Sequence, residues 1–180
     1  MRKVLSILAL LVVSACSGTL PASYTPQTFV SLPGTRAAVG DFNYLPSDEG
    51  KVQSNQIQNT AIGNVLIGED VAVYVRRATA LELQKGGTRV DANNGKVISG
   101  QVNKILADDL GYSVRWSYSV TYTVSNRSSG AQVFQKTYEA KPRKTGKFSQ
   151  PADFVAVFNA MITDGIEQFM SEVKRTRVLR

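Results

Sequence analysis

Histidine is absent from the 180-residue sequence, and cysteine occurs once, at Cys16. Without an imidazole the chain cannot build a Ser-His or Cys-His nucleophile pair, nor a histidine metal site. Long apolar runs are also scarce. The run from Val4 to Val13 is shorter than the roughly 20 residues that a membrane-spanning helix needs. These absences exclude the commonest hydrolase chemistry and a spanning helix over residues 4–13.

Carboxylates are the remaining candidates for catalysis, and Asp108 and Asp109 form an adjacent pair. Neighbouring side chains on a strand point to opposite faces, so these two share a site only if they lie in a turn. They directly precede Leu110 and Gly111, which is typical of a turn and not of a catalytic centre. We therefore expect no enzymatic activity, no cofactor and no bound metal.

The N-terminus has the three regions of an export signal. Positive charge at Arg2 and Lys3 is followed by the apolar run 4–13 and then by the small residues Ser14 and Ala15. This order predicts a signal peptide over residues 1–15. It leaves a mature chain of 165 residues, a length that suits one domain.

Residues 13–16, VSAC, resemble the lipobox of bacterial lipoproteins. The resemblance implies that the Cys16 sulfur receives a diacylglycerol, that the chain is cut before Cys16, and that the freed amino group is acylated. Several acyl chains give durable attachment, because each buried CH₂ contributes about 0.8 kcal/mol. The simpler alternative is an ordinary secretory signal with an incidental cysteine. Ser17 is the sorting residue in this reading. It is compatible with an outer-membrane lipoprotein facing the periplasm, and the inner membrane is the alternative.

Positive charge exceeds negative charge modestly. Loss of Arg2 and Lys3 with the signal lowers the formal net charge from +7 to +5. Basic residues concentrate in the stretch 141–147 and in the tail 174–180. We interpret them as solvated surface or as contacts for anionic headgroups. Nucleic acid is not expected, because no aromatic residues interleave with the basic ones. The candidate ligand or partner contacts are Lys141, Arg143, Lys144 and Lys147.

Residues 17–36 contain three prolines and no helical or strand periodicity. This composition predicts a lipidated N-terminus and extended tether over residues 16–36, followed by a single periplasmic domain over residues 37–180. Residues 45–64 are polar and irregular. A loop of that length is uncommon unless it is functional or mobile, so it is a candidate for partner contact.

Periodicity predicts the elements of the domain. Apolar and polar residues alternate without a break over residues 112–126, which is typical of a strand buried on one face. Helical spacing predicts a helix over residues 69–85 and another from Pro151 to about Lys174. We expect an α+β fold: an antiparallel sheet of about four strands with two helices packed on one face, in the order β-α-β-β-β-α. The further strands are expected at residues 37–44, 97–108 and 133–140.

These segments resemble the small envelope lipoproteins of the YajG type and the auxiliary lipoproteins of ABC transport systems. The resemblance rests on segments that include AAVGDFNY at 37–44, VISGQVNKILAD at 97–108 and VFNAMITDGIEQFM at 157–170. The resemblance implies a periplasm-facing domain attached to a membrane, and it brings no catalytic residues. The loop 45–64 and the tail 174–180 have no counterpart, so the identity of a partner cannot be carried over.

Two functions fit these observations. The first is a non-catalytic accessory lipoprotein that docks to a transport or assembly complex through an exposed edge strand or the loop 45–64. Its partners are the membrane, through acyl chains on Cys16, and an envelope protein complex, with no nucleic acid and no metal. The alternative is a module that binds an amphiphile, a phospholipid or a lipopolysaccharide, between helices and sheet. That cavity would be lined by Trp116, Tyr118, Phe158 and Phe169, with the segment 141–147 near its mouth.

Overall fold

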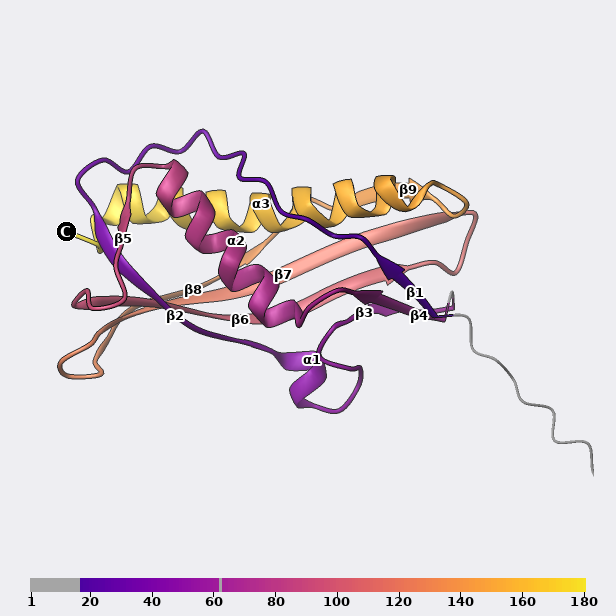
Figure 1. Cartoon of the computed structure of the whole chain (residues 1–180), viewed down its shortest axis with the longest axis horizontal. Coiled ribbons are helices and arrows are strands. Elements are labelled where there is room, and N and C mark those ends of the chain that lie inside the picture. Colours follow the sequence, from indigo (N-terminus) through magenta and orange to yellow (C-terminus); the bar gives the residue numbers. More distant parts are fainter. Residues whose placement is uncertain (1–16, 62) are drawn as a thin grey trace, which may run out of the picture.

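The computed structural model describes residues 17–61 and 63–180. The described chain forms two layers, a nine-stranded sheet and a layer of two long helices on one of its faces (Figure 1). The signal peptide predicted over residues 1–15 and the lipidation predicted at Cys16 lie outside the described residues.

Two long antiparallel strands, β6 (Lys96–Asp108) and β7 (Ser113–Asn126), form the centre of the sheet. The alternation predicted for β7 is confirmed, because every second side chain from Val114 to Val124 is buried. Tyr122 of β7 stacks on Phe169 of the helix layer, with ring centroids 4.3 Å apart. Aromatic side chains of the central hairpin therefore fill the space between the two layers.

Shorter strands line the two outer edges of this hairpin. On one side β2 (Arg36–Tyr44) and β3 (Gln56–Asn59) pair with successive parts of β6, both in parallel. On the other side β8 (Gln132–Glu139) and β9 (Arg143–Gly146) pair antiparallel with β7. The sheet is completed by β5 (Arg89–Val90) beside β2, β4 (Asn64–Ile67) beside β3, and β1 (Ser17–Leu20) beside β4.

The expectation of about four antiparallel strands is therefore wrong in number and direction, while the α+β class holds. The sheet is mixed, because the connection from β2 to β6 crosses over the sheet through a helix and so brings the two strands parallel. The strands that were not predicted have two to four residues each. Such short segments carry no measurable period, so the pattern of the sequence did not reveal them.

Helices α2 (Val71–Lys85) and α3 (Pro151–Thr176) cover the same face of the sheet, as predicted. The apolar stripe of α3 lies on β7, and Gly165 allows the close approach: a Cβ there would lie 2.8 Å from a ring carbon of Tyr118. A third, short helix, α1 (Leu45–Asp48), follows β2. No helix of the described residues is long and apolar enough to cross a membrane.

The face of the central hairpin that the helices leave uncovered carries small polar side chains. Asn103 of β6 donates a hydrogen bond to the Thr121 hydroxyl of β7 at 2.9 Å. The hydroxyls of Thr121 and of Thr137 on β8 lie 2.7 Å apart. These side chains bond to one another across three adjacent strands, so the middle of the uncovered face is polar.

Candidate functional site

The N-terminal segment does not form a free tether in the described chain. Residues 21–35 are extended but run across the helix layer from β1 to β2 (Figure 1). Tyr24, Thr28 and Leu32 recur every fourth position in this segment, and all three are buried. The prediction of a tether through residue 36 therefore needs correction: Pro restricts the backbone as expected, but these side chains have enough apolar surface to pack. We call residues 21–35 the strap.

The carboxylate of Glu82 on α2 binds the strap. It accepts hydrogen bonds from the Tyr24 hydroxyl at 2.6 Å and from the backbone amides of Gln27 and Thr28 at 2.9 and 2.8 Å. The Tyr24 hydroxyl also lies 2.8 Å from that of Thr163 on α3. Burial, and then the hydrogen bond to Glu82, raise the pKa of Tyr24 well above its usual value, so the phenol stays protonated.

Glu82 is fully buried, and its position on α2 indicates this burial. On α2 the buried positions Val71, Val75 and Ala78 define one stripe, and Glu82 lies one turn further along the same stripe. A carboxylate at such a position must have partners, because an isolated buried charge is very costly. Which segment supplies those partners could not be read from the helix alone.

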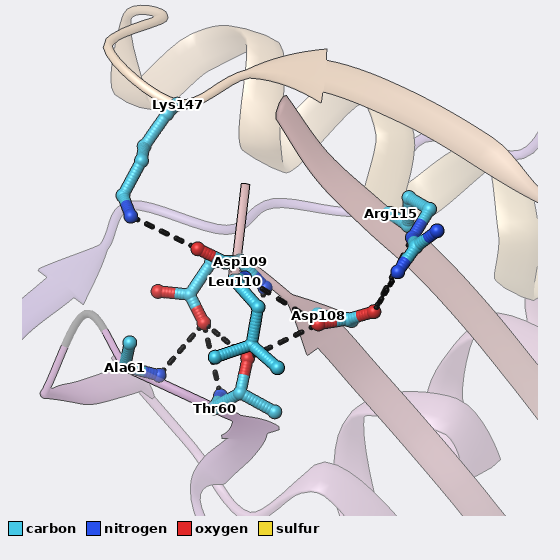
Figure 2. Close-up of polar contacts among 7 residues, drawn as sticks. All are labelled: Thr60, Ala61, Asp108, Asp109, Leu110, Arg115 and Lys147. Carbon is cyan, nitrogen blue, oxygen red and sulfur yellow. Dashed lines mark hydrogen bonds and ion pairs between the residues drawn. The ribbon is translucent and has the colours of Figure 1, made fainter. Parts of the chain in front are cut away.

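A second carboxylate, that of Asp109, binds a loop at one end of the sheet (Figure 2). Its Oδ1 atom accepts hydrogen bonds from the Thr60 hydroxyl at 2.5 Å, the Thr60 amide at 3.0 Å and the Ala61 amide at 2.7 Å. Burial alone would raise the pKa of Asp109, but these hydrogen bonds outweigh it and hold the pKa below its usual value. The carboxylate therefore stays ionised and ties the loop after β3 to the end of β6.

Asp108 is the last residue of β6, and the turn begins with Asp109. The two carboxylates share one partner, because the Thr60 hydroxyl lies 3.3 Å from Asp108 Oδ1 and 2.5 Å from Asp109 Oδ1. Asp108 forms an ion pair with Arg115 at 2.8 Å, and the hydrogen bond from Arg115 lowers its pKa. The backbone oxygen of Asp109 accepts a hydrogen bond from the Lys147 Nζ atom at 2.9 Å. As Figure 2 shows, both carboxylates are used to hold loops and strands together.

The four basic residues singled out in the sequence do not share one surface. Arg143 forms an ion pair with Asp164 of α3 at 3.0 Å, whereas Lys144 is the next residue of β9 and lies on the opposite face of the sheet. Lys147 is engaged with Asp109, and Lys141 is exposed before β9. A contact role for these residues remains a prediction.

The side chains proposed to line an amphiphile cavity belong to the packed core. Trp116, Tyr118, Phe158 and Phe169 are almost completely buried. Trp116 packs on Phe154 with ring centroids 5.7 Å apart, and its ring nitrogen donates a hydrogen bond to Thr145. A lipid chain between helices and sheet would have to displace such contacts.

Residues 45–64, predicted as an irregular loop, contain more structure than expected. They include α1 and β3, and Ile57 of β3 is fully buried in the core. Ser54 donates a hydrogen bond to Asp70 at the start of α2. The segment is thus fastened to the domain, which reduces its suitability as a mobile docking loop.

The outer edge of β8 is an eight-residue backbone edge at the rim of the sheet. In the part of the chain that is described, β8 pairs with β7 alone. Its two charged residues are Lys136 and Glu139, and Lys136 is turned toward α3, where it pairs with Glu172 at 3.1 Å. Charged side chains on an edge strand normally discourage added strands. Because Lys136 is turned toward α3, its charge does not block the outer edge of β8.

Comparison with solved structures shows the fold that this chain shares. A Xanthomonas campestris protein described under the family model DUF330 superposes with a TM-score of 0.68 at 11% identity, over 90% of this chain and 96% of that one. A minor lipoprotein from Acinetobacter baumannii has a TM-score of 0.48 at 11% identity, over 79% and 94%. The PelC dodecamer from Paraburkholderia phytofirmans gives 0.46 at 17% identity, over 78% and 93%.

The likeness to the Xanthomonas protein establishes the fold. Lipoproteins are among the other solved structures that match, but the likenesses do not single out the YajG type. The sequence matches no family model. It also matches no curated protein.

Proposed function

We propose that the protein is a lipid-anchored, non-catalytic accessory lipoprotein of the bacterial cell envelope. It faces the periplasm from the outer membrane and docks to a transport or assembly complex. The observation that carries this proposal is that the residues following Cys16 are held in the fold. Ser17 already pairs with Asn64 in the sheet, and the strap is bound by Glu82. The segment beside the lipobox is thereby built into the fold.

The docking surface in this proposal is the outer edge of β8. Eight residues of backbone are open to an added strand, which would gain main-chain hydrogen bonds. Val133 near the start of β8 is 41% exposed and offers an apolar contact. Strand addition is a common way for a small domain to join a larger assembly.

Crosslinking in cells tests the docking edge. A photoreactive residue at Val133 or Gln135 is expected to give an adduct with a protein other than this chain, and one at Arg76 on α2 is not. Val133→Lys should suppress the adduct formed from Gln135. Val73→Lys is the matched control, because Val73 on α2 is 47% exposed, close to the value for Val133. Recovery of only the monomer from both β8 positions would overturn the docking proposal.

The anchor is tested on the purified protein by mass spectrometry. The mature N-terminal peptide should begin at Cys16 and carry the mass of a diacylglycerol with an additional acyl chain. Cys16→Ser should lack that mass, and its processing should no longer respond to inhibition of the lipoprotein signal peptidase. A mature N-terminus at any other residue would refute lipidation.

A further inference from the structure

Three large apolar side chains are exposed together at one end of the sheet. The exposed fractions are 74% for Leu110, 98% for Tyr112 and 91% for Phe148. Leu110 and Tyr112 lie in the turn between β6 and β7, and Phe148 lies in the loop between β9 and α3. We call these three side chains the apolar tip.

Hydrogen bonds from Lys147 join the two loops of the apolar tip. The Lys147 backbone amide donates to the backbone carbonyl oxygen of Tyr112 at 3.4 Å. The Lys147 Nζ atom donates to the backbone carbonyl oxygen of Asp109 at 2.9 Å. Tyr112 and Phe148 are therefore held on adjacent loops of one end. Figure 2 shows Lys147 reaching across to the Asp109 turn.

Turn formation does not account for these side chains. Turns favour Gly, Asn, Asp and Ser, and the turns at the opposite end of the sheet use them at residues 92–95 and 127–130. A single exposed apolar residue such as Phe29 is ordinary, whereas several on adjacent loops mark an interaction surface. The apolar tip therefore requires a partner of apolar character.

The start of the described chain lies at the same end as the apolar tip. Ser17 pairs with Asn64, the first residue of β4. The loop just before β4 is the one whose Thr60 and Ala61 amides bind Asp109, next to Leu110. Figure 1 shows β1, β4 and the turn between β6 and β7 gathered at one end of the molecule. Cys16 directly precedes this position in the sequence.

We propose that the apolar tip inserts into the interfacial region of the phospholipid bilayer that holds the anchor. The inference rests on the proposed lipidation of Cys16, which brings the bilayer to this end. Tyrosine is favoured at the membrane interface because its ring is apolar and its hydroxyl remains hydrated. Lys144 is exposed on β9, close enough to the tip to meet lipid phosphates. The domain is thus attached at two places, by acyl chains and by side chains.

Depth-dependent quenching tests the insertion. Tyr112→Cys and Phe148→Cys are each labelled with an NBD fluorophore in the full lipidated protein, where the Cys16 sulfur is blocked as a thioether. The protein is reconstituted in vesicles of phosphatidylethanolamine and phosphatidylglycerol, with or without doxyl-labelled lipid. Ser128→Cys is the control, because β7 places it about 40 Å from Tyr112 at a rise of about 3.3 Å per residue. We expect several-fold quenching at positions 112 and 148 and none at 128.

Flotation of the same vesicles separates the two proposals. If the protein floats and the probes at 112 and 148 are unquenched, insertion is overturned while the anchor stands. If the protein stays at the bottom of the gradient and the probes are unquenched, both fail. Blue-shifted but unquenched emission would indicate that a protein surface covers the tip, and this also overturns insertion.

Discussion

Two buried carboxylates far apart in the fold accept hydrogen bonds from the same kinds of donor, and within the described residues Glu82 does so through both oxygens and Asp109 through Oδ1 alone. Glu82 accepts hydrogen bonds from one hydroxyl and from two consecutive amides, those of Gln27 and Thr28. Asp109 accepts from one hydroxyl and from the consecutive amides of Thr60 and Ala61. In both cases the donors come from a segment about 50 residues away in sequence. Glu82 fixes the strap, which pairs with no strand of the described chain, whereas Asp109 extends the contact that β3 already makes with β6.

The two sites differ in their surroundings. Glu82 lies between α2 and the strap, and its donors Tyr24 and Thr28 are buried. The donors to Asp109, Thr60 and Ala61, belong to an exposed loop. When the Asp109 carboxylate is removed, water can accept the hydrogen bonds of the loop amides. When the Glu82 carboxylate is removed, water cannot easily reach the buried donors. The same contacts therefore contribute more stability where solvent cannot compensate for their loss.

Removal of the Glu82 carboxylate should give the largest loss of stability. Glu82→Ala leaves two amides and a phenol without their acceptor, and we expect the free energy of unfolding to fall by about 3 kcal/mol in urea denaturation. Gln84→Ala, an exposed position on the same helix, is the control and should have little effect. Equal effects of the two substitutions would contradict the role assigned to Glu82.

Removal of the Asp109 carboxylate should cost less, about 2 kcal/mol, because the loop amides regain water. Asp109→Ala is measured by the same denaturation. Hydrogen exchange at Thr60 and Ala61 should accelerate, while exchange at Gln27 and Thr28 stays unchanged. Faster exchange in the strap would show that the two sites are coupled, contrary to this expectation.

The stability that Asp109 contributes should depend on acid pH. Because its pKa is lower in the folded state than the usual value near 3.9, the folded state favours the ionised form. This contribution is present above about pH 4 and is lost as the pH falls through the folded pKa. The stability difference between wild type and Asp109→Asn should therefore shrink below about pH 4. A difference that grows on acidification would contradict the assigned sign.

Loss of a single donor to Glu82 should have a smaller effect. Tyr24→Phe removes the hydroxyl but keeps the ring, and should lower the free energy of unfolding by about 1 kcal/mol. A double-mutant cycle with Glu82→Gln should give a non-zero coupling energy, because the two groups are in contact. Additive effects would indicate that the hydrogen bond contributes nothing to stability.

The exposed ion pair beside Asp109 should have the smallest effect. Arg115→Ala leaves Asp108 in water, and solvent screening makes such pairs weak. We expect no measurable change in the denaturation midpoint at neutral pH. A loss as large as that of Asp109→Ala would show that Asp108, and not Asp109, fastens this end.

Patterns inside single elements were predictable, because burial imposes a period on them. The strand predicted over 112–126 is β7, and the helices predicted at 69–85 and from Pro151 to about Lys174 differ from α2 and α3 by two residues at one end each. Contacts between distant segments were not predictable. Tyr24 and Thr60 each bind a carboxylate that no local pattern connects to them.

The apolar tip and β1 were also outside the reach of the sequence patterns. Leu110, Tyr112 and Phe148 look unremarkable in a sequence, and their common exposure results from two loops that meet only in the fold. The four residues of β1 have no period, and their pairing depends on β4. The lipidation predicted at Cys16 depends on a linear processing motif and stays a prediction.

The pairing of β1 with β4 would limit how the domain moves on the lipid anchor proposed at Cys16. A flexible linker would let the domain take many orientations above the membrane, and this would lower the effective concentration of its docking surface. Acyl chains on Cys16 would instead be attached to the residue directly before β1, whose first residue, Ser17, pairs with Asn64. A linker this short would leave the domain less orientational entropy to lose on meeting a partner. In the proposed anchored state, the edge of β8 would stay within a narrow range of heights above the membrane, and a partner in that membrane would meet it by diffusion in two dimensions.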